Sequence, residues 1–212
     1  SIWQLASLVR LSLPDNRLAE LPAGLGSLSA LTKLDIRTNR FEHFPGDVCK
    51  LVHLQDLDLS HNALTVIPTS ITQLSSLAVL RLSHNRLTRF ADAICEVRSL
   101  TSLDMGYNGL AELPESITLL TSLVHLDLAG NPLQVPPKEI ILGAAQDDLK
   151  AIRRYFDTYC VATFTGRKWR VQLPPRLGQG SIWPVPSVLT AVLPDARSVS
   201  MSMPPGVTFG QN

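Results

Sequence analysis

Residues 8–28 read LVRLSLPDNRLAELPAGLGSL, and this stretch carries the pattern that decides the fold. Leucines occur at 8, 11, 13, 18, 21, 25 and 28, and an asparagine follows the third of them. The same frame returns along the chain at a strict period of twenty-three positions, which places its asparagines at Asn16, Asn39, Asn62, Asn85, Asn108 and Asn131. A fixed period of this length is typical of a repeat protein, in which each repeat is one supersecondary unit.

The physics of such a repeat favours a stack of coils. One coil cannot bury its own apolar face, so neighbouring coils must cover one another. The alternation in Leu11-Ser12-Leu13 predicts a short strand with one face buried. Successive strands then lie side by side in a parallel sheet, about 4.8 Å apart. The sixth copy departs from the frame, with Pro136-Pro137 in place of the expected Leu-Pro.

Six copies in register over roughly residues 1–145 resemble the leucine-rich repeat family in its 23-residue form. The resemblance implies an α/β fold, a right-handed leucine-rich-repeat solenoid with a curved parallel sheet on its concave face. It also implies that each repeat asparagine bonds backbone groups of its loop, so that the stacked coils form an asparagine ladder. We therefore interpret all six asparagines as structural.

The two ends of the repeat region carry separate expectations. Ile2 and Leu5 match Leu25 and Leu28 one period earlier, so residues 1–7 are a partial repeat ahead of six repeats that end near 146. More repeats or a cap are therefore expected upstream. Residues 147–160 are predicted to form a C-terminal capping helix, because Leu149, Ile152 and Phe156 share one helical face.

The segment that closes the repeats gives a narrower resemblance. Asn131-Pro132-Leu133, the run Pro136-Pro137-Lys138-Glu139-Ile140 and the stretch 151–156 look like the closing segment of intracellular Ras-group and Roco-type leucine-rich-repeat proteins. Residues 161–212 form a Pro-rich tail: its part from 171 on has seven of the fifteen prolines and three charged residues. We expect this tail to be poorly structured, either disordered or loosely packed.

Composition excludes several function classes. Nineteen Lys and Arg against eighteen Asp and Glu give a net charge of +1, which argues against nucleic acid as a partner. No apolar run is long enough to span a membrane. The cysteines at 49, 95 and 160 fit neither a disulfide framework nor a zinc site. Cys49 and Cys95 are interpreted as small buried hydrophobes, and the absence of a disulfide pattern favours a reducing, cytoplasmic setting.

No catalytic motif is recognisable in the chain. A phosphate-binding loop, a nucleophile elbow, a zinc-protease motif and a dinucleotide fingerprint are all missing. The sequence therefore predicts a protein that is not an enzyme and that carries no cofactor and no metal.

The candidate functional surface is the concave face of the sheet, here called the sheet face. Positions one repeat period apart form columns on this face. The columns give a basic sector in the first coils, including Arg40, a mixed centre and an acidic sector at the far end. Asp58, Arg81 and Asp104 are adjacent across strands and are predicted to form a row of surface ion pairs. The candidate protein-binding residues are Arg10, Lys33, Asp35, Arg37, Asp58, His61, Arg81, His84, Asp104, Tyr107, His125 and Asp127.

Three residues of one column raise specific alternatives. His61 and His84 are neighbours about one strand spacing apart. They could bind a metal or sense pH, but a third ligand is not evident, and plain exposure in an ordinary loop of this family is the alternative. Tyr107 follows them in the same column and is the best single candidate for a binding anchor, because Tyr is favoured at interface hot spots.

Two functions are compatible with the sequence. The first is a non-catalytic protein–protein interaction module, an intracellular signalling scaffold or adaptor. The resemblance to Ras-group repeats implies a small GTPase, a kinase or a phosphatase as its partner. The second is the recognition arm of a larger GTPase, kinase or ubiquitin ligase whose catalytic part is outside this chain. Immune-type recognition is neither favoured nor excluded.

Overall fold

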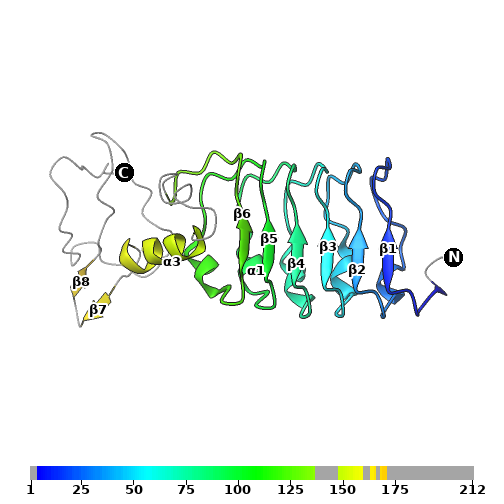
Figure 1. Cartoon of the computed structure of the whole chain (residues 1–212), viewed down its shortest axis with the longest axis horizontal. Helices are drawn as coiled ribbons and strands as arrows, with labels where there is room; N and C mark the ends of the chain where they lie inside the picture. The colour runs from blue at the N-terminus through cyan, green and yellow to red at the C-terminus, as the bar shows by residue number, and fades with distance from the viewer. Residues whose placement is uncertain (1–3, 137–147, 160–162, 166–167, 171–212) are drawn as a thin grey trace. The chain divides into compact units, whose positions relative to one another are not determined.

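Six three-residue strands follow one another at the repeat period and form a single parallel sheet in chain order (Figure 1). The computed structural model describes residues 4–136, 148–159, 163–165 and 168–170. The register is offset by one repeat at every step, so that Leu11 lies beside Leu34 and Leu34 beside Leu57. The strands are β1 (Arg10–Ser12), β2 (Lys33–Asp35), β3 (Asp56–Asp58), β4 (Val79–Arg81), β5 (Ser102–Asp104) and β6 (His125–Asp127).

Short helical turns lie on the other side of the strands from the sheet face (Figure 1). Pro45, Pro68 and Pro114 directly precede three of them, with φ between −74° and −70°, the value that the proline ring fixes. The coil that has Ala91 at this position forms an α-helical turn instead of a 3-10 turn. These turns are η2 (Leu25–Ser27), η3 (Gly46–Lys50), η4 (Thr69–Gln73), α1 (Asp92–Cys95) and η5 (Glu115–Leu119).

The core lies between the sheet and these turns and repeats from coil to coil. The central strand leucines Leu34, Leu57, Leu80 and Leu103 are at most 1% exposed. Burying each such side chain is worth about 1.5–3 kcal/mol relative to exposure. The coils therefore hold one another together through equivalent apolar contacts, which is the solenoid arrangement that the repeat predicts.

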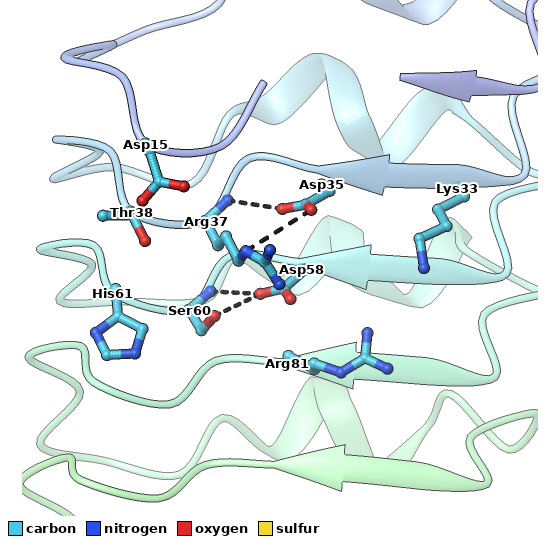
Figure 2. A pocket seen from close by; sticks show the side chains of 9 residues that line it. All are labelled: Asp15, Lys33, Asp35, Arg37, Thr38, Asp58, Ser60, His61 and Arg81. Atoms are coloured by element: carbon cyan, nitrogen blue, oxygen red, sulfur yellow. Dashed lines mark hydrogen bonds and ion pairs between the residues drawn. The ribbon is translucent and has the colours of Figure 1, made fainter. Parts of the chain in front are cut away.

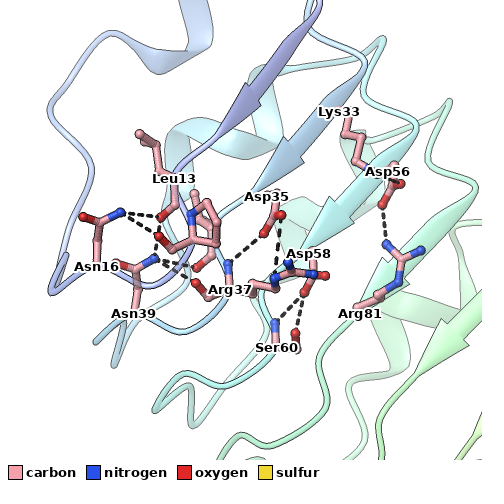
Figure 3. Close-up of polar contacts among 12 residues, drawn as sticks. Leu13, Asn16, Lys33, Asp35, Arg37, Asn39, Asp56, Asp58, Ser60 and Arg81 are labelled. Atoms are coloured by element: carbon pink, nitrogen blue, oxygen red, sulfur yellow. Dashed lines mark hydrogen bonds and ion pairs between the residues drawn. The ribbon is translucent and has the colours of Figure 1, made fainter.

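The asparagine ladder is present as expected (Figure 3). The Asn39 side chain donates to the carbonyl of Leu13 in the preceding coil at 2.9 Å and to Ile36 in its own coil at 3.1 Å. Its Oδ1 accepts the Leu18 backbone N–H at 3.0 Å. Asn62, Asn85, Asn108 and Asn131 repeat this geometry. Each of these side chains thus joins two coils and satisfies backbone groups that the loop leaves unpaired.

The structure divides the chain into two compact units, residues 1–152 and 153–212. The helix predicted near the end of the repeats is confirmed as α3 (Asp148–Tyr159), and its Ile152, Tyr155 and Phe156 are buried. Its capping role stays a prediction. In the tail, β7 (Thr163–Thr165) and β8 (Lys168–Arg170) pair antiparallel, although the sequence predicts no strand there. The proline-rich remainder lies outside the described residues. Among the residues that are described, no helix has the length and hydrophobicity to cross a membrane.

Candidate protein-binding face

The site is built by the strands and by the loops that follow them. The parallel register places equivalent residues of successive coils side by side, so the sheet face is a set of ordered columns. A hollow of about 620 Å³ opens on the first four coils of this face (Figure 2). The residues that line it are all polar or charged: Asp15, Lys33, Asp35, Arg37, Thr38, Asp58, Ser60, His61 and Arg81.

Six of the twelve predicted binding residues line this hollow: Lys33, Asp35, Arg37, Asp58, His61 and Arg81. The other six lie outside it, Arg10 on β1, Asp104 on β5, His125 and Asp127 on β6, and His84 and Tyr107 in the loops after β4 and β5. Asp15, Thr38 and Ser60 also line the hollow and are not among the predicted residues. The repeat period could have identified them, because each stands in the same column as a predicted residue or directly beside one.

The ion pairs differ from the predicted row. Arg81 lies between Asp58 and Asp104 in the register, but its Nη1 atom contacts Asp56 Oδ1 at 2.6 Å. Asp56 Oδ2 also accepts from Lys33 Nζ at 2.8 Å (Figure 3). The predicted row of Asp58, Arg81 and Asp104 is therefore wrong. A long arginine side chain reaches diagonally to a carboxylate that points outward.

The aspartates of the predicted row are held by the backbone instead. Asp58 Oδ1 accepts the Ser60 backbone N–H at 3.0 Å and its hydroxyl at 2.6 Å, and the Asp58 residue is only 6% exposed. The same bond to the N–H two residues on recurs in three further coils, at 2.8–3.2 Å, for Asp35, Asp104 and Asp127. These side chains close the turn after the strand, a role that aspartates commonly take. Much of this column is therefore structural.

Pairing also reduces the free positive charge of the basic sector. Lys33 is paired with Asp56, a carboxylate that it shares with Arg81, and Arg37 Nε lies 3.8 Å from Asp35 Oδ2. Within the described residues, Arg10 and Arg40 make no ion pair. The hollow thus combines three cations with nearby carboxylates and presents alternating charge, which suits a polar protein surface better than a polyanion.

His61, His84 and Tyr107 form a continuous aromatic stack along the loops. The two imidazole rings lie 4.2 Å apart with planes 12° from parallel, and the His84 ring lies 4.3 Å from the Tyr107 ring at 8°. The ring nitrogens of parallel rings point in parallel directions and do not converge on one ion. Among the described residues there is no group of three side chains that could hold a metal. The geometry therefore favours a surface role for the two histidines over a metal site.

Cys49 and Cys95 lie in the core, as expected. Cys49 and Cys95 are free thiols that are 1% and 0% exposed. Burial raises the pKa of both thiols, that of Cys95 to about 11. A protonated, buried thiol is a poor nucleophile, so these residues add no chemistry to the site. Cys160 lies outside the described residues.

Comparison with known proteins identifies the family. The Leucine rich repeat family model matches residues 6–64, 29–87, 52–110 and 75–133, which together span more than half of the chain. The chain belongs to the leucine-rich repeat family. No curated protein sequence matches it.

Solved structures agree with this membership. A leucine-rich repeat protein of Leptospira interrogans is 35% identical with a TM-score of 0.63, and the match covers 71% of this chain and 37% of that one. The plant peptide hormone receptor RGFR1, in complex with RGF2, is 33% identical with a TM-score of 0.55 over 61% and 22% of the two chains. A third structure is the receptor kinase ectodomain GASSHO1/SCHENGEN3 of Arabidopsis thaliana, in complex with CASPARIAN STRIP INTEGRITY FACTOR 2. It is 33% identical with a TM-score of 0.56, and the match covers 62% of this chain and 17% of that one. The match thus spans well under half of each of these proteins.

Proposed function

We propose that this chain is a non-catalytic protein-binding module whose sheet face receives a partner protein. The observation that carries the proposal is the hollow at the first four coils, which six of the predicted residues line. Leucine-rich repeats generally mediate protein–protein interaction, and no catalytic family is indicated for this chain. The structures of the two plant receptors named above were each solved in complex with another molecule, RGF2 in one and CASPARIAN STRIP INTEGRITY FACTOR 2 in the other, which supports a similar use of the repeats here.

The chemistry of the hollow supports a polar, charged partner surface. Its cations and carboxylates lie on rigid strands in a fixed register, so a partner meets them without a large cost of ordering the binding site. A partner with charges in the complementary order would gain specificity and a faster association rate. Our finer proposal is a cytoplasmic signalling scaffold or adaptor that binds a small GTPase, a kinase or a phosphatase. It is supported by the resemblance of the closing segment to Ras-group and Roco-type proteins.

Affinity capture with a charge-reversal variant tests the proposal. Arg37 lies in the hollow with half of its side chain exposed, so Arg37→Glu changes the charge of the hollow without opening the core. Arg98 is an exposed cation before β5, at the opposite end of the strands from the loops that follow them, and Arg98→Glu is the matched control. Quantitative mass spectrometry is expected to find a protein that wild type and Arg98→Glu retain and Arg37→Glu loses. Identical sets for all three chains would contradict the proposal.

A further inference from the structure

The aromatic stack is fixed by an unusual backbone conformation. His61, His84 and Tyr107 have φ of 54°, 54° and 52°, in the left-handed region that few residues other than glycine adopt. Their backbone N–H groups donate to the next coil, to the carbonyls of Ser83, Gly106 and Ala129, at 2.9, 2.9 and 2.6 Å. The repeated bond holds each residue in the same orientation. Rings at equivalent positions therefore stack face to face.

The stack presents mainly ring edges, because the outer face of His61 is the one ring face that neither another ring nor Gly130 covers. Both faces of His84 are covered, by His61 on one side and by Tyr107 on the other. The far face of Tyr107 lies against Gly130, where an added Cβ would be 2.6 Å from Tyr107 Cδ1. Tyr107 is nonetheless 56% exposed, so a partner meets its edge and hydroxyl. Aromatic edges carry partial positive charge, and imidazole N–H and phenol O–H groups are donors.

Free arginines flank the stack. Arg40 and Arg86 stand in the column directly after the repeat asparagines, so only the inward-facing asparagine separates them in sequence from the stacked column. Both are exposed, and neither makes an ion pair within the part of the chain that the structure describes. Across both columns the one acidic residue is Asp15, in the first coil, where it stands in line with Thr38 and His61 (Figure 2).

The ridge formed by His61, His84, Tyr107, Arg40 and Arg86 therefore offers donors, positive edges and unpaired cations, but no carboxylate. We infer that this loop ridge binds an acidic, extended segment of the partner protein, an inference that rests on the proposed protein-binding function. Arg40 and Arg86 are two coils apart, about 10 Å, a span that an extended chain covers in about three residues. Two glutamates at that separation would each face one arginine and form charge-assisted hydrogen bonds.

A single-stranded nucleic acid is the competing ligand for a basic aromatic surface. Such ligands bind by stacking their bases on open aromatic faces. The inner faces of this stack are closed by the rings themselves and the outer face of Tyr107 lies against Gly130, so only the outer face of His61 could receive a base. The observations therefore favour a ligand with carboxylates. A carboxylate can approach the ring edges and the arginines in the plane of the N–H and O–H groups that donate to it.

An NMR titration of the isotopically labelled full chain tests the inference. The probe is a short Gly-Ser peptide with two glutamates three residues apart, and its control has glutamines in their place. We expect the glutamate peptide to shift the resonances of Arg40, Arg86 and Tyr107, and the glutamine peptide to leave them unchanged. The double substitution Arg40→Gln/Arg86→Gln should weaken binding about tenfold or more. Arg98→Gln, with the same charge change elsewhere, should not.

The stack itself is tested by His84→Ala, which removes the central ring and is expected to weaken binding while the other resonances keep their dispersion. Equal binding by the double arginine variant, or shifts confined to the hollow around Arg37, would overturn the inference. Tighter binding of a single-stranded oligonucleotide to the ridge would replace it with nucleic-acid binding. Capture that depends on Arg37 without peptide binding contradicts this inference alone. Binding of the glutamate peptide to the ridge, without any capture that depends on Arg37, contradicts the proposed function alone.

Discussion

The phenol ring of Tyr107 lies parallel to the imidazole of His84, with the ring centroids 4.3 Å apart and the planes 8° from parallel. Neither residue is in the core, yet each holds the other in place on the loop surface. The glycine of the next coil completes this arrangement, because Gly130 leaves room for the far face of the Tyr107 ring. The order of the loop ridge thus depends on a residue without a side chain.

Gly130→Ala is the first prediction. Its Cβ would lie 2.6 Å from Tyr107 Cδ1, and alanine would have to adopt φ of +71°. The left-handed backbone alone costs about 1–2 kcal/mol, and displacing the ring adds to that loss of unfolding free energy. In a Tyr107→Ala background the clash is absent, so the same substitution should cost only the backbone strain. Urea unfolding of wild type, the two single variants and the double variant measures how much stability Gly130→Ala removes with and without the Tyr107 ring. An equal loss of unfolding free energy in both backgrounds would exclude contact between Gly130 and the ring.

The asparagine ladder gives a second prediction. Asn108 is 8% exposed, accepts the Leu87 N–H at 3.0 Å and donates to the carbonyls of Leu82 and Met105. Asn108→Ala leaves these buried backbone groups unpaired, at about 1–3 kcal/mol for each group that water cannot reach. Asn16 is the matched control, since it is exposed and, among the described residues, its side chain bonds only carbonyls of its own coil. Chemical denaturation should show a clearly larger loss for Asn108→Ala, and a loss no greater than that of Asn16→Ala would contradict the ladder's role between coils.

Asp56 is predicted to matter little for stability. It accepts from both Lys33 and Arg81, but those side chains are 46% and 39% exposed. Exposed ion pairs contribute about 0–1 kcal/mol and are screened by salt. Asp56→Ala should therefore lower the free energy of unfolding by at most about 1 kcal/mol, and high salt should reduce that difference. A larger loss that salt does not change would indicate a packing role for the residue.

The repeat could be predicted from sequence, while the surface chemistry could be predicted only in part. The repeat period sets which residues are neighbours, so the strand register and the Asn39 bonds follow from it. The direction of a long side chain does not follow, and this is why the predicted partners of Arg81 are Asp58 and Asp104 whereas the observed partner is Asp56. The stack escapes prediction for another reason. The repeat period shows that His61 and His84 are neighbours. It does not show that their rings are parallel, because that orientation depends on the left-handed backbone conformation that the structure reveals.

Asp47 is predicted to make stability depend on pH in the acidic range. The Asp47 carboxylate accepts a hydrogen bond from Lys50 Nζ at 2.6 Å and another from the Gly24 N–H at 3.0 Å. These two bonds hold the pKa of Asp47 below its usual value of 3.8. A carboxyl whose folded-state pKa is lowered stabilises the fold above its unfolded pKa, and this contribution is lost as pH falls through the folded one. The stability difference between wild type and Asp47→Ala should be constant near neutral pH and shrink below about pH 4. Thermal unfolding across pH measures it, and a difference that grows on acidification would contradict the assigned bonds.

The buried thiols provide a last prediction, on the opening of the coils. Cys95 is fully buried, and burial raises the pKa of its thiol to about 11, so very little thiolate exists at neutral pH. In the native protein, iodoacetamide should therefore modify Cys49 and Cys95 only when their coils open. Denaturant should expose both to rapid reaction, and mass spectrometry of the peptides reports each site separately. Asn108→Ala, which weakens the ladder beside Leu82 and Leu87, is expected to speed the modification of Cys95 more than that of Cys49. Rapid labelling of Cys95 in the folded wild type would contradict its burial.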